Sequence, residues 1–256
     1  MIGFDRDSAR LREKPSADLM RITFVSSLSE VAQADVVIIA VPVASALEML
    51  KGIAPHVEHA RLVIDVGSTK RSIVDAAERL GIGDRFVGGH PMAGDHRFGW
   101  EATRGGLFVD APVYLCPTPS TTEEALALAG EFWGSLGARP TVMDAVAHDE
   151  RLAWTSHMPH AVASALALSL ASVHVPRAEL GPGGRDMTRV SGSSPEMWEQ
   201  IMLDNAGAVL PALEAMETRL RDLRSRVRSD NPDAVRKWFT EGRDWFMRSE
   251  TPAAHS

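Results

Sequence analysis

The chain has 256 residues, of which 45% are apolar and 24% are charged, and its formal net charge at pH 7 is −7. This balance is that of a globular protein with one large domain or two modest ones, long enough to bury a sizeable core. The acidic charge argues against a nucleic-acid-binding protein, because neutralising phosphates requires clustered lysines and arginines.

Cys116 is the only cysteine, which excludes an intrachain disulfide and fits a reducing compartment. Its apolar neighbours predict a buried thiol within a strand. The N-terminus lacks the basic and apolar regions of a signal peptide. The longest apolar stretch, residues 161–175, is shorter than the roughly 20 residues that span a bilayer. We therefore expect a cytoplasmic protein that does not enter a membrane.

Strand and helix patterns alternate along the first half of the chain. The expected strands are 2–5, 35–42, 62–67, 85–90, 113–116 and 140–143, and the expected helices are 43–50, 69–80 and 121–136. Continuous apolar runs such as Asp35–Pro42 are typical of strands buried on both faces, as in parallel sheets. Short connections between alternating strands and helices predict a Rossmann-like, doubly wound α/β domain over residues 1–145.

The pattern becomes helical beyond about residue 145. One helical stripe is formed by apolar residues three and four apart, namely Leu210, Leu213, Met216, Leu220, Leu223 and Val227. Asn231 and Pro232 are a suitable cap and first residue for a last helix. We expect an all-helical domain over residues 146–248 and a frayed tail over residues 249–256.

Three predicted strands end in residues that could meet at one crevice. Ligands of doubly wound sheets bind beyond the carboxyl ends of the strands. Ser68, His90 and the pair Val41–Pro42 each stand at such an end. This position selects Ser68 and His90 as candidates for the reactive residues.

His90 lies in the segment Gly88-Gly-His-Pro-Met-Ala-Gly94. The glycines allow close approach of the backbone or unusual dihedral angles, and Pro91 fixes the chain direction after the histidine. An imidazole held in this way suits general acid–base catalysis, because its pKa lies near neutrality. The alternative is a turn histidine bonded to the backbone.

Arg185 and Arg189 are four residues apart, which places them on one face of a helical turn. Two guanidinium groups on one face suit a substrate with two carboxylates, since each can bind a carboxylate bidentately. The alternative is a surface ion pair with Asp186 or Glu196.

His157 and His160 are three residues apart, a spacing that occurs in metal sites. No cysteine or acidic residue nearby completes a ligand set, so we expect no metal. A role in a substrate site or in packing is the better interpretation.

Residues Ile2-Gly-Phe-Asp5 predict a strand that ends in an acid. In dinucleotide-binding folds, an acid at the end of the second strand bonds the adenosine ribose, about 20 residues after a G-x-G-x-x-G turn. No such turn precedes Asp5 here. The acid favours NAD, whereas the adjacent Arg6 could accept the 2′-phosphate of NADP.

Six segments carry a resemblance to a known family: Asp65-Val-Gly-Ser-Thr-Lys70, Gly88-Gly-His-Pro-Met-Ala-Gly94, His148-Asp-Glu-Arg151, Ser156-His-Met-Pro-His160, Arg185-Asp-Met-Thr-Arg189 and Pro195-Glu-Met-Trp198. In order and spacing they resemble the prephenate/arogenate dehydrogenases, over about residues 2–248. The resemblance implies an NAD(P)-dependent oxidative decarboxylation of prephenate or arogenate in tyrosine biosynthesis. It also implies a homodimer built through the helical domain.

The resemblance further implies roles for individual residues. His90 would accept the proton of the substrate hydroxyl, and Ser68 would orient His90 or that hydroxyl. Arg189 would bind a substrate carboxylate. Weaker candidates for the same pocket are Arg185, His157 and Trp198. The candidates for cofactor binding are Asp5, Arg6, Val41, Pro42, Gly67 and Ser68.

The chain departs from the family pattern in three places. The family begins with a strand–turn–helix unit that carries the glycine motif and is missing here, so we hypothesise a misassigned start. Asp95 and His96 stand where the family more often has Thr-Glu. No regulatory domain follows the helical half, so any feedback by tyrosine would act within the two domains.

The sequence leaves two other classes of protein open. An inactive dimeric remnant would bind a partner or an aromatic metabolite. A β-hydroxyacid dehydrogenase would need a lysine on a helix of its second domain, and the only lysine beyond Lys70 is Lys237. The sequence does not separate prephenate, arogenate and amino-substituted prephenate as substrates.

Overall fold

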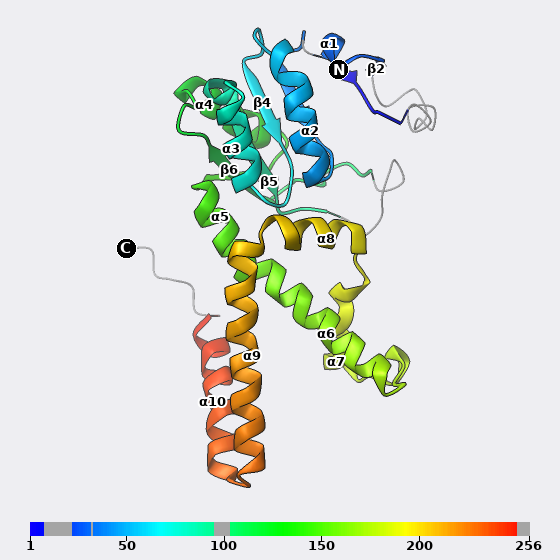
Figure 1. The fold of residues 1–256 in the computed structure, drawn as a ribbon, viewed down its shortest axis with the longest axis vertical. Helices are drawn as coiled ribbons and strands as arrows, with labels where there is room; N and C mark the ends of the chain where they lie inside the picture. Colours follow the sequence, from blue (N-terminus) through cyan, green and yellow to red (C-terminus); the bar gives the residue numbers. More distant parts are fainter. Residues whose placement is uncertain (8–21, 32, 95–102, 250–256) are drawn as a thin grey trace. The chain divides into compact units, whose positions relative to one another are not determined.

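A computed structural model describes residues 1–7, 22–31, 33–94 and 103–249 (Figure 1). The chain divides into two compact units, Met1–Val209 and Leu210–Ser256, and each is described by itself. Asp95, His96 and the expected tail beyond Ser249 lie outside the described residues.

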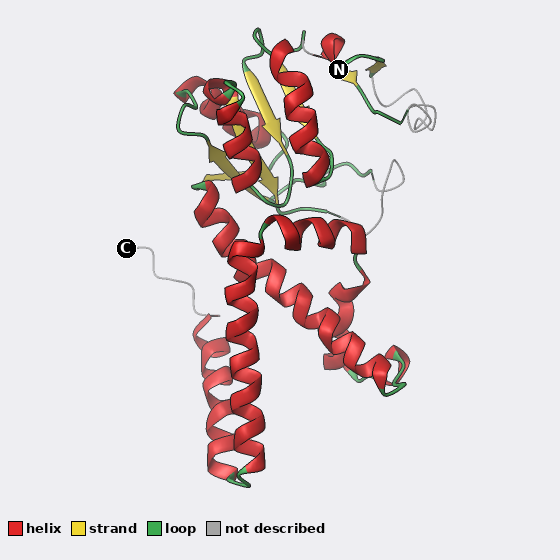
Figure 2. Ribbon diagram, viewed as in Figure 1, coloured by secondary structure: helices red, strands yellow, loops and turns green. Residues whose placement is uncertain are grey.

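A five-stranded sheet forms the centre of the first unit, in the order β3-β4-β5-β6-β7 (Figure 2). Its strands are β3 (Val36–Ile39), β4 (Leu62–Asp65), β5 (Phe86–Pro91), β6 (Pro112–Pro117) and β7 (Arg139–Val142). The expected Rossmann-like α/β fold is confirmed, with one correction, because β6 runs antiparallel to β5. An antiparallel pair needs no crossover helix. The described parts of the β5–β6 connection contain no helix.

The strand expected at residues 2–5 is present as β1 (Ile2–Gly3). It pairs in parallel with β2 (Thr23–Phe24) and forms a separate two-stranded sheet. In the described part of the chain, β4 is the one strand that pairs with β3, so β3 is an edge of the larger sheet. Ile38 on this edge strand is 43% exposed.

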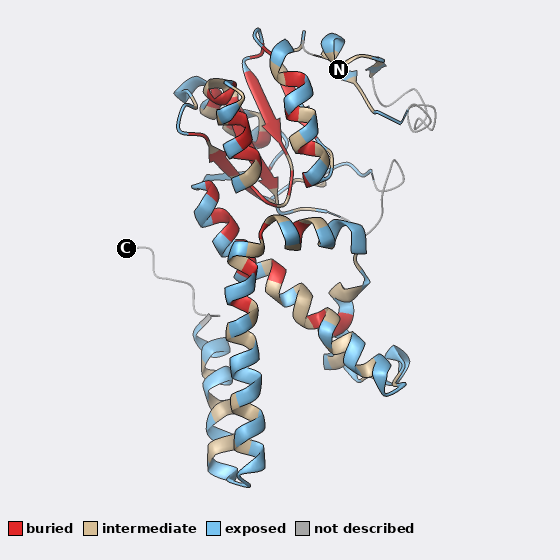
Figure 3. Cartoon of the chain, viewed as in Figure 1, coloured by how far each residue is buried: buried red, intermediate tan, exposed pale blue. Residues whose placement is uncertain are grey.

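Helices cover both faces of the larger sheet, which separates the core into two clusters. Figure 3 shows β4 buried at the centre of this arrangement. On one face, α2 (Val43–Ile53) and α3 (Arg71–Arg79) pack against residues such as Val63. On the other face, α4 (Glu123–Ser135) packs against Leu62 and Ile64. Alternate residues of β4 therefore enter opposite clusters. Burying one apolar side chain of this size fully, rather than leaving it exposed, contributes about 1.5–3 kcal/mol to the free energy of folding.

All regular structure described beyond β7 is helical, as expected. The helices are α5 (Ala145–Leu152), α6 (Met158–Ser172), α7 (Pro182–Thr188), α8 (Pro195–Asp204), α9 (Ala206–Arg228) and α10 (Pro232–Ser249). A single π-helical turn, Ala153–His157, joins α5 to α6. Asn231 Oδ1 accepts hydrogen bonds from the backbone N–H groups of Asp233 and Ala234, which confirms the predicted cap of α10.

Short elements complete the described structure. They are α1 (Leu28–Val31) and the single-turn helices Ala54–His56, Gly83–Arg85, Arg177–Glu179 and Arg189–Gly192. None of the described helices combines the length and apolarity needed to cross a bilayer.

Candidate active site

A buried ion pair joins the carboxyl ends of β4 and β5. The side chains of Lys70 and Asp65 are both fully buried and in contact. Lys70 Nζ also donates to the carbonyl oxygen of Gly89 at 2.8 Å. The Asp65 carboxylate accepts the backbone N–H groups of Gly67 at 2.7 Å and Gly89 at 3.2 Å. These bonds fix the backbone immediately before His90.

The approach of β5 to β4 requires a glycine at position 89. A Cβ atom there would lie 2.5 Å from the carbonyl oxygen of Asp65, closer than real Cβ atoms come to any atom. The close backbone approach predicted for the Gly88-Gly89 pair is therefore confirmed at Gly89.

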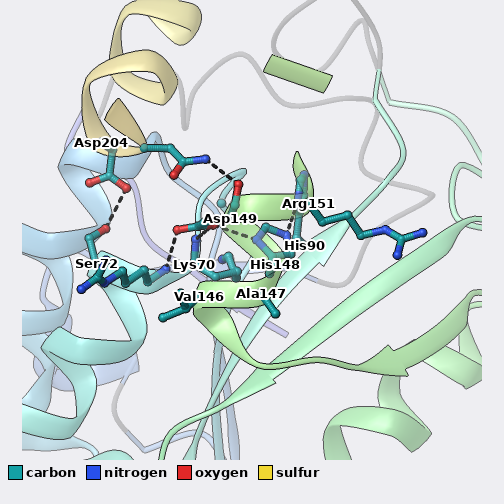
Figure 4. A network of polar contacts seen from close by, with 12 residues as sticks. Lys70, Ser72, His90, Val146, Ala147, His148, Asp149, Arg151 and Asp204 are labelled. Atoms are coloured by element: carbon teal, nitrogen blue, oxygen red, sulfur yellow. Dashed lines mark hydrogen bonds and ion pairs between the residues drawn. The ribbon is translucent and has the colours of Figure 1, made fainter. Parts of the chain in front are cut away.

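His90 lies at the end of β5 and is 8% exposed (Figure 4). Its Nδ1 atom is 2.9 Å from Nε2 of His148, and Nδ1 of His148 is 2.8 Å from Oδ1 of Asp149. The Asp149 carboxylate accepts the backbone N–H groups of Lys70 at 2.8 Å and Arg71 at 3.0 Å. Asp149 on α5 thus caps the N-terminus of α3 and anchors the two histidines.

Burial lowers the pKa of His90 well below its ordinary value, and the nearby charge of Lys70 lowers it further. A neutral ring at neutral pH can accept a proton. The ring of Tyr114 packs edge-on against His148, with 5.4 Å between the ring centroids.

His157 closes the π-helical turn and is 1% exposed. Asn205 Nδ2 lies 3.2 Å from Nδ1 of His157 and donates to the carbonyl oxygen of Asp149 at 2.8 Å. Burial lowers the pKa of His157 to about 4. Asn205 therefore connects His157 to the segment that holds His90.

Trp198 on α8 lies between two histidines. The ring of His160 stacks on it with 3.9 Å between centroids, and His157 meets it edge-on at 6.0 Å. Burial lowers the pKa of His160, and the charge of Arg189 adds a smaller effect in the same direction. Trp198 therefore contacts both histidines, and the charge of Arg189 acts on His160.

The two candidate arginines differ in what they contact. Arg185 donates to the carbonyl oxygen of Ala178 at 2.9 Å. Arg189 is exposed, and within the described residues its guanidinium makes no ion pair. The alternative ion pairs with Asp186 or Glu196 do not occur among these residues. Of the two, Arg189 is the one whose guanidinium makes neither a hydrogen bond nor an ion pair within the described residues.

Ser68 is half-buried in the loop after β4. The described contacts of His90 include His148 and no bond from Ser68, so the proposed orienting role of Ser68 stays a prediction. Sequence reasoning did not single out His148, Asp149 or Asn205 as site residues. The His-Asp dyad within the segment 148–151 was the signal that could have identified the first two.

A hollow of about 450 Å³ lies beyond the ends of β1 and β2. It is lined by Phe4, Asp5, Arg6, Phe24, Val25, Ser26 and Glu30. The Arg6 guanidinium lies 3.6 Å from the Glu48 carboxylate of α2, with both side chains exposed. Val41 and Pro42 follow β3, and Gly67 follows β4.

The hollow and the strand ends fit part of a dinucleotide site. Asp5 follows β1 and lines the hollow, and its predicted role toward the ribose stays a prediction. In the described residues, no glycine-rich turn joins a strand to a following helix, so these residues offer no such turn for the pyrophosphate. Those same residues contain no group of three side chains that could hold a metal ion.

Two domains of one family match the chain in succession. The nucleotide-binding domain of prephenate dehydrogenase matches residues 1–142, and the dimerization domain matches residues 144–241. The chain belongs to the prephenate dehydrogenase family.

Individual members of the prephenate dehydrogenase family resemble the chain over most of its length. Cyclohexadienyl dehydrogenase of Zymomonas mobilis is 34% identical over 216 residues, which cover 82% of this chain and 74% of the relative. Prephenate dehydrogenase of Lactococcus lactis is 33% identical over 251 residues, covering 95% and 68%. A crystal structure of prephenate dehydrogenase from A. aeolicus with hydroxyphenyl propionate and NAD+ gives a TM-score of 0.85 at 31% identity, covering 97% of this chain and 88% of that one.

Proposed function

We propose that this chain catalyses the NAD+-dependent oxidative decarboxylation of prephenate to 4-hydroxyphenylpyruvate, or of arogenate to tyrosine. The observation that carries the proposal is the buried His90 at the end of β5, with a depressed pKa and a fixed hydrogen-bond partner. A neutral histidine at this position can accept the proton of the substrate hydroxyl. Family membership supplies the substrate class.

Proton transfer to His90 is the chemical step that the chain itself performs. As the hydroxyl of the substrate ring loses its proton to the imidazole, hydride can leave the same carbon and carbon dioxide can leave the ring. Formation of the aromatic ring drives this change, so the protein mainly aligns and polarises the substrate. A positioned general base of this kind contributes about 10²–10⁴-fold in rate.

Arg189 is the residue that we propose for binding a substrate carboxylate, because its guanidinium has no ion-pair partner among the described residues. His157 and Trp198 would line the same pocket, since both contact or approach His160 beside Arg189. Arg185 is a weaker candidate, because its guanidinium already bonds a backbone carbonyl.

NAD+, when bound, supplies the hydride acceptor. We propose that Asp5 holds the adenosine ribose and that Val41, Pro42, Gly67 and Ser68 line the path to the reacting carbon. NAD+ is favoured over NADP+ because the hollow at Asp5 contains a second acid, Glu30, and because Glu48 faces Arg6, the one arginine among the described lining residues. These acids would repel a 2′-phosphate.

We also propose that the chain acts as a cytoplasmic homodimer, with a nucleotide-binding domain over residues 1–145 and a dimerisation domain over residues 146–248. The family's dimerization domain matches residues 144–241. In α9 the stripe residues Leu210, Leu220 and Val227 are 56–61% exposed, which fits a surface covered by a second copy.

The proposal is tested by the stoichiometry of the products. Purified chain would be incubated with NAD+ and either prephenate or arogenate, and NADH and carbon dioxide would be measured in the same sample. We expect equal amounts of the two products from one of these substrates. NADH without carbon dioxide would indicate an ordinary alcohol dehydrogenase and would exclude oxidative decarboxylation. The inactive alternative predicts neither product from folded protein, and no observation at the site favours it.

A further inference from the structure

The hydrogen bonds around Asp149 determine where the protons of two buried histidines lie. Both carboxylate oxygens of Asp149 accept backbone N–H groups, those of Lys70 and Arg71, at the N-terminus of α3. A helix N-terminus stabilises the ionised carboxylate, which can only accept hydrogen bonds. The proton in the 2.8 Å contact between His148 Nδ1 and Asp149 Oδ1 therefore belongs to His148.

The tautomer of His148 in turn determines the tautomer of His90. A neutral imidazole with its proton on Nδ1 has a lone pair on Nε2. His148 Nε2 must then accept across the 2.9 Å contact with His90 Nδ1, so His90 carries its proton on Nδ1. We infer that Asp149, acting through His148, fixes His90 in the Nδ1–H tautomer and leaves His90 Nε2 as the nitrogen that takes the substrate proton.

His157 provides a built-in comparison, because its surroundings impose the opposite tautomer. Asn205 Nδ2 donates to the carbonyl oxygen of Asp149, which identifies this atom as the amide nitrogen. The same NH₂ group lies 3.2 Å from Nδ1 of His157, so that nitrogen accepts and the ring proton lies on Nε2. The carboxylate of Asp149 thus leaves His90 Nε2 as an acceptor, and the amide of Asn205 leaves His157 Nε2 as a donor.

The arrangement also supports the proton once it has moved. When His90 Nε2 gains the substrate proton, its Nδ1–H faces the lone pair of His148, and the new positive charge is directed toward Asp149. The groups acting on His90 from the surrounding elements are the cation Lys70, the rings of His148 and His157, and the carboxylate of Asp149 beyond His148. The proton returns to the oxygen when the ring becomes a phenol. His148 and Asp149 are therefore positioning residues for His90.

The test is nuclear magnetic resonance of the full chain labelled with ¹⁵N-histidine at neutral pH, without substrate or cofactor. Chemical shifts of ring nitrogens distinguish protonated from unprotonated atoms, and spectra of His90→Asn, His148→Phe and His157→Gln assign the signals. We expect a protonated Nδ1 and a bare Nε2 at His90, with the reverse at His157. A proton on His90 Nε2, or an imidazolium at His148, would overturn the inference.

A kinetic measurement separates positioning from mere packing. His148→Phe keeps a ring against Tyr114 and removes both nitrogens, so we expect kcat to fall about 10–100-fold with little change in KM, the usual effect of losing an orienting partner. The exposed His59→Gln is the control. Unchanged kcat in a folded His148→Phe protein would contradict the role. If that variant does not fold, the spectrum of the unmodified chain decides.

Only the role of His90 as the base depends on the function proposed above. The protonation pattern can be found correct while no turnover occurs, or found wrong in an active dehydrogenase, so the two failures are distinguishable.

Discussion

His157 illustrates how a buried histidine makes stability depend on pH. Burial lowers its pKa from 6.5 to about 4. Between these values the unfolded chain binds a proton that the folded chain does not, so stability must decrease as pH falls from about 6.5 toward 4. The pKa of His90 is shifted in the same direction.

We predict a slope of up to about 1.4 kcal/mol per pH unit for each such histidine in this range. Urea unfolding at several pH values would measure the slope in the wild type, in His157→Gln and in the exposed control His59→Gln. The slope of stability against pH should be smaller in His157→Gln than in the wild type, and His59→Gln should have the wild-type slope. An equal slope in all three proteins would show that His157 is not held neutral by burial.

At the scale of elements, the spacing of β4 and β5 depends on one missing side chain. Gly89→Ala would place a Cβ atom 2.5 Å from the Asp65 carbonyl oxygen, and backbone cannot move aside as a flexible side chain can. We predict a loss of about 1–3 kcal/mol in the free energy of unfolding, as overpacked cores usually show.

Gly134→Ala in α4 is the matched control, because nothing lies within 4 Å of its added Cβ. This substitution should leave stability unchanged or raise it by up to about 1 kcal/mol, since alanine favours helix. Denaturant unfolding of both variants measures the contrast. If Gly89→Ala were as stable as the wild type, the close approach of the two strands would not be required.

Elements and single residues differ in how far the sequence could predict them. The strand expected at residues 62–67 corresponds to β4, because the apolar run Leu62–Ile64 is typical of a strand buried on both faces. The direction of β6 was not predictable, because an apolar run is the same in parallel and antiparallel pairs. His90 could be selected from its place at a strand end. The pairing of His90 with His148 could not be predicted, since this contact spans 58 residues and exists only after folding.

For the whole molecule, the exposed stripe of α9 predicts association through the helical domain. Light scattering should give about twice the chain mass of 27.7 kDa. Leu220→Glu places a charge in the stripe and should shift the protein toward monomer, whereas Thr218→Glu, exposed and outside the stripe, should not. A wild-type protein that is monomeric at every concentration would contradict the proposed homodimer.

The most direct test of the account is the rate of NADH formation by the wild type and by His90→Asn, with prephenate or arogenate and NAD+. Asparagine can still donate to His148 but offers no basic nitrogen, so the fold should survive. We predict that kcat falls about 10²–10⁴-fold while the thermal unfolding midpoint stays close to that of the wild type. A folded His90→Asn enzyme that turns over at the wild-type rate would show that His90 is not the base.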